Sequence, residues 1–222
     1  MSTNLRFFCA NCVIAALLLA TSAWLSAAPG PKRGPAAPHA DRSETTYRGG
    51  LVTPPLTKPQ FTLTDTSGAP FDFRVDTEGY VTLLFFGYTH CPDECPLHMA
   101  AIATSLQQIP REVRDQVKVV FVTADPVRDT PTALRAWLNH FDRRFIGLTG
   151  NPVAIEAAQR AAQVPAASKT VLANRAYEVG HASFVLAYTK DNLAHVIYPG
   201  GITPMDWAHD LPVLVKEGWS SY

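Results

Sequence analysis

The sequence lacks an excess of either charge, because its 222 residues include 19 lysines and arginines against 19 aspartates and glutamates. It also lacks a run of basic residues. Binding to nucleic acid phosphates needs a clustered basic surface, so nucleic acid is excluded as the main partner. Hydrophobic residues still make up 47% of the chain, enough for the core of one compact domain with flanking segments.

The apolar run near the N-terminus, residues 13–25, is shorter than the roughly 20 residues that a membrane-spanning helix usually needs. It follows Arg6 and ends in the small residues Ser26, Ala27 and Ala28. This pattern predicts a secretory signal peptide over residues 1–28, cut near Ala28, with an uncleaved membrane anchor as the alternative. Either form predicts a periplasmic or otherwise exported protein, which the anchor would hold at the inner membrane.

Cysteine is scarce, with four in the chain. Cys9 and Cys12 lie in the predicted signal, so cleavage would leave only Cys91 and Cys95. A structural disulfide normally closes a long loop, because its stabilising effect grows with loop length. A bond between residues four apart would restrain the unfolded chain little. The pair is therefore predicted to be reactive or metal-binding.

Residues 29–50 are rich in proline and glycine and show no apolar periodicity, which predicts a flexible tether. Residues 51–222 have the pattern of one α/β domain, in which strand-like runs alternate with helical ones. We expect a mostly parallel sheet with flanking helices and an N-terminal hairpin. The expected strands are residues 61–63 and 71–73 of the hairpin, 81–86, 117–123, 145–148, and a closing pair at 183–188 and 194–198.

Three helices are predicted from a capping residue followed by proline, at Thr130-Pro131, Asn151-Pro152 and Thr203-Pro204. The apolar stripe of the first extends to Phe141. Pro212 interrupts the stripe of the last, so we expect a kink or an early end there.

The two cysteines follow the expected strand at residues 81–86, at the edge of the sheet where ligands bind in α/β proteins. Because proline is tolerated only in the first turn of a helix, the next helix is predicted to begin at Pro96, with Cys95 near its N-cap. The positive end of the helix dipole favours thiolate there. Two thiolates select soft ions, and Cu(I) is satisfied by two or three ligands, whereas closed zinc sites have four. Of the neighbouring histidines, we expect both His90 and His98 to be exposed.

Three sequence strings carry a resemblance to a known family. They are GYTHCPDECP at residues 87–96, DPVRDTP at 125–131 and YEVGHASF at 177–184. The chain resembles, over residues 51–219, the Sco (SenC) family of copper-binding proteins, whose motifs are G-[FY]-T-x-C-P-D-x-C-P, D-P-x-R-D-T-P and Y-x-V-D-H-S-x-F. One departure is Gly180, which stands where the family usually has an acidic residue before the histidine.

The resemblance implies a thioredoxin-like fold and a copper site, for Cu(I) or Cu(II), made of Cys91, Cys95 and His181. It also implies a metallochaperone that matures the dinuclear copper centre of cytochrome c oxidase. The expected partners are the copper-bearing oxidase subunit or another cuproprotein, and a second copper chaperone. From the residues alone, the choice among seven histidines stays open.

Two questions stay open at this stage. Cys91 and Cys95 could instead form the redox-active disulfide of a thiol–disulfide oxidoreductase acting on a cuproprotein, which leaves open whether the chain is an enzyme. Against this stands the absence of proline from residues 180–188, where such reductases carry a cis-proline. Asp125, Arg128 and Asp129 fit either an ordinary β–α loop or a loop that supports the metal ligands or docks a partner.

Overall fold

The computed structural model describes residues 47–173, 177–216 and 219, all within the compact unit of residues 43–222. The predicted signal or anchor at residues 1–28 and nearly all of the tether at 29–50 lie outside the described residues. Among the helices that are described, none combines the length and the apolar character needed to cross a membrane.

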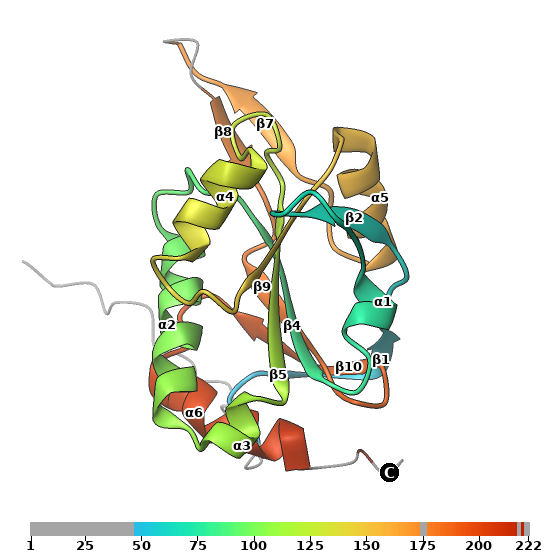
Figure 1. The fold of residues 1–222 in the computed structure, drawn as a ribbon, viewed down its shortest axis with the longest axis vertical. Coiled ribbons are helices and arrows are strands. Elements are labelled where there is room, and N and C mark those ends of the chain that lie inside the picture. The colour runs from blue at the N-terminus through green and yellow to red at the C-terminus, as the bar shows by residue number, and fades with distance from the viewer. Residues whose placement is uncertain (1–46, 174–176, 217–218, 220–222) are drawn as a thin grey trace, which may run out of the picture. The chain divides into compact units, whose positions relative to one another are not determined.

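Eight strands form one sheet in the order β1-β10-β9-β4-β5-β6-β2-β3 (Figure 1). A separate hairpin joins β7 to β8. The strands are β1 (Gly50–Thr57), β2 (Thr62–Asp65), β3 (Pro70–Asp72), β4 (Val81–Gly87), β5 (Val117–Thr123), β6 (Ile146–Thr149), β7 (Ser168–Val171), β8 (Tyr177–Gly180), β9 (Phe184–Tyr188) and β10 (Leu193–Pro199).

The direction of the strands corrects the expectation of a mostly parallel sheet. Only β4–β5 and β5–β6 pair in parallel, and the other five pairings are antiparallel. Parallel strands need a long crossover, which helices supply between β4, β5 and β6, whereas short turns join the antiparallel pairs β2–β3 and β9–β10. The predicted N-terminal hairpin is confirmed as β2–β3. The strand β1 was not predicted, because Pro54 and Pro55 argue against a central strand; it lies at the edge, where proline is tolerated.

The helices cover both faces of the sheet, with α2, α4 and α6 on one side and α1 and α5 on the other (Figure 1). Strand β4 is buried throughout and supplies both cores, because successive side chains point to opposite faces. Leu83 and Phe85 enter one core, and Leu84 and Phe86 the other. The helices are α1 (Phe73–Asp76), α2 (Glu94–Gln108), α3 (Arg111–Arg114), α4 (Pro131–Leu138), α5 (Pro152–Ala161) and α6 (Pro204–Lys216).

The three predicted helix starts are confirmed by their caps. The side chain of Thr130 accepts a hydrogen bond from Ala133 N, and Asn151 caps α5 in the same way. Thr203 and Asp206 cap each other reciprocally. These caps satisfy amides that have no partner within the helix.

Two helix ends differ from the sequence prediction. Helix α4 ends at Leu138 instead of Phe141, although Phe141 still packs against the core. Helix α6 continues through Pro212 to Lys216, so of the two expected outcomes, a kink or an early end, the early end is wrong. An interior proline costs about 3 kcal/mol, but burial of Leu211 and Leu214 beside it contributes about 1.5–3 kcal/mol each. Packing therefore outweighs the proline.

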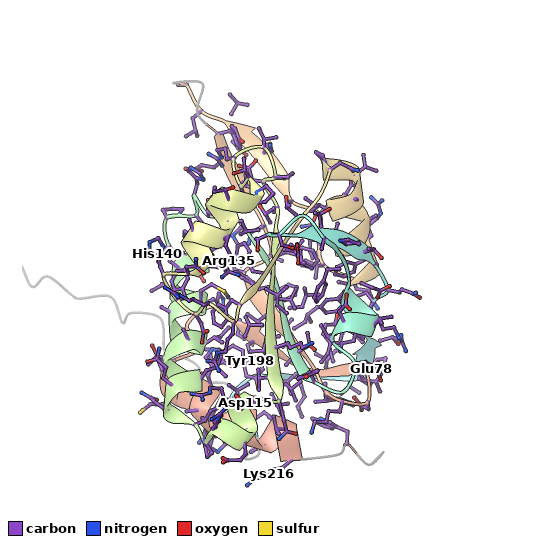
Figure 2. The ribbon with its side chains drawn as sticks, in the orientation of Figure 1. Glu78, Asp115, Arg135, His140, Tyr198 and Lys216 are labelled. Carbon is purple, nitrogen blue, oxygen red and sulfur yellow. The ribbon has the colours of Figure 1, made fainter. Side chains whose placement is uncertain are left out.

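Helix α6 also attaches the start of the described chain to the domain. Tyr198, labelled in Figure 2, is fully buried with its ring centroid 4.1 Å from that of Trp207. Its hydroxyl donates to the buried carboxylate of Asp210 at 2.9 Å. Asp210 also accepts a hydrogen bond from the backbone amide of Arg48 at 2.7 Å.

Lys58 makes the stability of the domain depend on pH. It is buried, and its ammonium group donates to Thr77 O and Thr82 Oγ1. Burial lowers the pKa of Lys58 from 10.5 to about 8. Between these pH values the unfolded chain binds more protons than the folded one, so the free energy of unfolding is expected to rise with pH. Denaturant titrations from pH 7 to 10.5 should show this rise in the wild type and in the control Lys216→Met. In Lys58→Met the rise should be smaller, because only the lowered pKa values of other groups such as Lys118 and Cys91 still contribute to it. An equal rise in that variant would contradict the assignment.

Candidate metal centre

The cysteine loop connects β4 to α2 and places the two sulfur atoms at the edge of the sheet. Helix α2 begins at Glu94, two residues before the predicted start. Pro96 therefore occupies the third helical position, where its missing N–H has no partner within the helix to lose. Cys95 lies in this first turn and is fully buried, whereas Cys91 lies in the preceding loop and is partly exposed. Neither cysteine forms a disulfide.

The structure brings Cys91, Cys95 and His181 together. Their donor atoms all lie within 4.8 Å of one another, and Cys95 Sγ is 3.4 Å from His181 Nε2. Within the described ranges, no other group of three or more His, Cys, Asp or Glu side chains is arranged to hold a metal ion. His181 reaches this place because it precedes β9, which pairs with β4 next to the cysteine loop.

The orientation of His181 leaves one ring nitrogen free for a metal. Nδ1 lies 3.0 Å from the carbonyl oxygen of Ala182. A carbonyl can only accept, so Nδ1 carries the proton and the lone pair remains on Nε2, the atom that faces Cys95. The rings of Tyr88 and Phe85 flank the imidazole edge-on, at centroid distances of 5.5 and 5.8 Å.

The two thiols differ in acidity because they share a hydrogen bond. The Cys95 thiol donates to Cys91 Sγ, and this bond is the main reason why the pKa of Cys91 lies well below its usual range. Backbone amides of Cys95 and Asp93 act in the same direction. The same bond, together with burial, raises the pKa of Cys95. Without metal the pair therefore holds a thiolate on Cys91 and a thiol on Cys95, and a metal ion would replace the remaining proton.

The other two histidines near the cysteines take different places. His90 has 53% of its side chain exposed, as expected. The expectation that His98 is exposed is wrong, because only 3% of this residue is accessible. Its Nε2 donates to Ser183 O at 3.3 Å. Cys95 lies on the face of α2 that packs against the sheet. His98 is three residues later, so it lies on the same face, and this spacing could have predicted its burial.

Asp129, from the loop after β5, holds the cysteine loop. It is fully buried. Its Oδ2 accepts from Thr89 N at 2.9 Å and from Thr123 Oγ1 at 2.7 Å. Its Oδ1 accepts from the Thr89 hydroxyl at 2.5 Å. Thr89 is two residues before Cys91, so Asp129 fixes the backbone that carries the first sulfur atom.

Asp125, from the same loop, holds the hairpin that leads to His181. It is fully buried and accepts from the Tyr177 hydroxyl at 2.9 Å and from Lys169 Nζ at 3.1 Å. It also accepts from Arg128 Nε, and Arg128 Nη1 donates to Tyr177 O at 3.2 Å. None of Asp125, Arg128 and Asp129 belongs to the group of metal-ligating atoms.

Sequence reasoning missed the structural role of Gly87, the last residue of β4. A Cβ atom at this position would lie 2.7 Å from Cys95 Sγ. Sequence reasoning also missed the hairpin of β7 and β8. Its only signal was Tyr177, which stands at the start of the third motif.

Fold and site together define a thioredoxin-like α/β protein with a centre of two sulfurs and one imidazole nitrogen. The family model described as SCO1/SenC matches residues 51–216. The chain belongs to the SCO1/SenC family.

Individual relatives agree with this assignment. The chain is 42% identical over 91 residues to the SCO2-like protein RC0895 of Rickettsia conorii, a match that covers 41% of this chain and 43% of the relative. It thus spans about half the length, or less, of the curated relatives it matches. Among solved structures, copper-bound ScoI of Bradyrhizobium japonicum is 31% identical with a TM-score of 0.64, covering 71% of this chain and 99% of that one. Apo Sco1 of Thermus thermophilus is 28% identical with a TM-score of 0.64, covering 78% and 96%.

Proposed function

We propose that this protein binds copper through Cys91, Cys95 and His181 and hands it to a cuproprotein, with the copper-bearing subunit of cytochrome c oxidase as the recipient. The observation that carries the proposal is the convergence of two sulfur atoms and one imidazole nitrogen within 4.8 Å. Membership of the SCO1/SenC family and the similarity to a copper-bound ScoI support copper as the cargo.

The donor set fits copper in either oxidation state. Thiolates are soft ligands that favour Cu(I), and imidazole suits Cu(II). A closed zinc site would want a fourth protein ligand, and no such ligand lies in the group that the described residues form. Partial exposure of Cys91 leaves the bound ion open to incoming ligands, which is a property of a carrier more than of a permanent store.

The place of delivery follows from the N-terminal segment. A signal or anchor over residues 1–28 would export the domain to the periplasm, and a tether over 29–50 would let it reach a membrane-bound recipient. We include in the proposal a second copper chaperone as the source of the metal.

Copper binding is tested by His181→Ala. The reduced wild type is expected to bind about one copper ion per chain, since the described residues form one soft-ligand site. Loss of a residue that only positions a metal ligand lowers metal affinity roughly 10–100-fold, so loss of the ligand His181 itself should lower Cu(II) affinity by more than that. Chelator competition measures both affinities. The control is His140→Ala, on an exposed histidine bonded only to Trp137 O. Unchanged Cu(II) affinity in His181→Ala would remove the imidazole from the site.

Delivery is tested separately from binding. The copper-loaded protein is mixed with the apo form of a soluble copper-bearing oxidase domain whose cysteines are reduced. Transfer should lower the copper content of the donor and raise that of the recipient by the same amount, as metal analysis of the separated proteins would show. Copper that stays on the donor over hours would refute delivery to this recipient and leave copper binding intact.

The second candidate is a thiol–disulfide oxidoreductase, favoured by the low pKa of Cys91 beside a second thiol. In this reaction the Cys91 thiolate attacks a target disulfide. Cys95, deprotonated in the second step, then displaces the target sulfur, so the target gains two thiols while Cys91 and Cys95 form a disulfide. Rapid reduction of insulin by the copper-free protein, with a reductant that regenerates it, would support this role.

A further inference from the structure

The two halves of the candidate site come from separate parts of the fold. Cys91 and Cys95 belong to the loop and helix after β4, while His181 directly follows the hairpin of β7 and β8. That hairpin is paired with no strand of the eight-stranded sheet within the described residues. The chain just before His181 is therefore held in place by side-chain contacts between the hairpin and the rest of the domain.

A single loop contacts both halves. It contains Asp125, Arg128 and Asp129 and follows β5, which lies next to β4 in the sheet. Asp129 accepts two hydrogen bonds from Thr89 in the cysteine half. Asp125 accepts hydrogen bonds from Tyr177 and Lys169 in the hairpin. Both carboxylates are fully buried, so neither can exchange its partners for water without cost.

Arg128 lies between the two halves. Its guanidinium carbon is 3.9 Å from the ring centroid of Tyr177 in the hairpin and 5.7 Å from that of Tyr88 in the cysteine loop. Tyr88 in turn contacts the imidazole of His181. Arg128 also donates to Asp125 and to the backbone oxygen of Tyr177. Arg128 therefore joins the hairpin of β7 and β8 to the cysteine loop, through hydrogen bonds to the hairpin side and through contacts of its charge with both tyrosine rings.

We propose that the loop at residues 125–129 is a two-armed support in which Asp129 positions the cysteine pair and Asp125, with Arg128, positions His181 through Tyr177. This inference rests on the proposed function, since it concerns the same metal site. The two arms hold different ligands, so breaking one should affect one half of the site. These residues are positioning residues, because none of them contacts the metal-binding atoms.

The arm that holds His181 is tested by Tyr177→Phe. This substitution keeps the ring and removes the hydroxyl that donates a hydrogen bond to Asp125. Cu(II) binding depends on the imidazole of His181. Loss of a residue that positions a metal ligand without binding the metal costs roughly 10–100-fold in affinity, so Cu(II) affinity should fall by about tenfold. Cu(I), which two thiolates satisfy, should change by less than about threefold. The reduction potential of the Cys91–Cys95 pair should stay unchanged. The control is Tyr80→Phe, at a tyrosine directly before β4 whose ring lies beneath Lys118 Nζ.

The arm that holds the cysteines is tested by Thr89→Val, which removes the hydroxyl bonded to Asp129. Here the reduction potential of the dithiol and the rate at which Cys91 reacts with a thiol reagent should both change. The ratio of Cu(II) to Cu(I) affinity should remain closer to that of the wild type than in Tyr177→Phe. Thermal unfolding of each variant separates these effects from a general loss of structure.

The outcomes are distinct. Equal loss of Cu(I) and Cu(II) affinity in Tyr177→Phe, or no loss of either, overturns the assignment of Asp125 and Tyr177 to His181. An unchanged potential and an unchanged Cys91 reaction rate in Thr89→Val overturn the assignment of Asp129 to the cysteines. A wild type that binds no copper defeats the proposed function itself. If wild type and Thr89→Val bind copper while Tyr177→Phe loses Cu(II) selectively, both the function and the arm that holds His181 are supported.

Discussion

Replacing Cys95 with serine is expected to reduce Cu(I) affinity by more than about a hundredfold, beyond the range that loss of an outer partner produces. A serine hydroxyl is a poor ligand for a soft ion. The change leaves one thiolate in the site, that of Cys91, beside the imidazole of His181. Chelator competition on the anaerobic, reduced protein measures the affinity. The rate at which Cys91 reacts with a thiol reagent should also change, because the bond from the Cys95 thiol is the main cause of the lowered pKa of Cys91.

The matched control is Cys12→Ser in the full chain, the same substitution at a cysteine of the predicted signal. It should leave Cu(I) affinity and the reactivity of Cys91 unchanged. A Cys95→Ser variant with wild-type Cu(I) affinity would refute a centre built on two thiolates, whatever the role of His181.

Replacing Gly87 with alanine is expected to damage the site and the core together. The added Cβ would lie 2.7 Å from Cys95 Sγ and 3.0 Å from the ring of Phe121, both buried. Overpacking of this kind typically costs about 1–3 kcal/mol, which for a domain of this size lowers Tm by roughly 2–4 °C per kcal/mol. Because Cys95 Sγ must move, Cu(I) affinity should fall as well.

The control for this prediction is Gly50→Ala. Its added Cβ would meet its nearest neighbour, a methyl carbon of Ile197, at 3.5 Å, an ordinary van der Waals contact. Calorimetry and chelator competition on both variants give the comparison. If Gly87→Ala unfolds at the wild-type temperature and binds Cu(I) as tightly, then the close approach of Gly87 to Cys95 has no importance for the site.

Local patterns predicted the elements of the fold better than their arrangement. The buried strands β4 and β5 and the capped starts of α4, α5 and α6 follow from apolar runs and from Thr130, Asn151 and Thr203, all of which act within a few residues. The direction of β9 and β10 depends on how short turns return the chain, and β1 depends on a free edge of the sheet. Such long-range features have no local signal, and a mostly parallel sheet was predicted for that reason.

The candidate site shows the same division. The spacing of Cys91 and Cys95 after a strand already indicated a soft-metal or redox pair. His181 lies 86 residues beyond Cys95, and only the resemblance to a family selected it among the histidines. The burial of His98 and the bonds of Asp125 and Asp129 arise from tertiary packing between α2, the loop after β5 and the hairpin. Sequence motifs placed these aspartates near the site but could not distinguish support of the ligands from docking.

The unequal exposure of the two sulfur atoms sets an order for ligand exchange. Cys91 is partly exposed, whereas Cys95 is completely enclosed by the domain. An incoming thiolate can therefore approach the ion from the side of Cys91 and His181, which are both partly exposed, and not from the side of Cys95. We expect copper to pass through an intermediate in which this protein and the recipient both bind the ion. Cys95 is then the last ligand of this protein to leave, so the ion is never released into water.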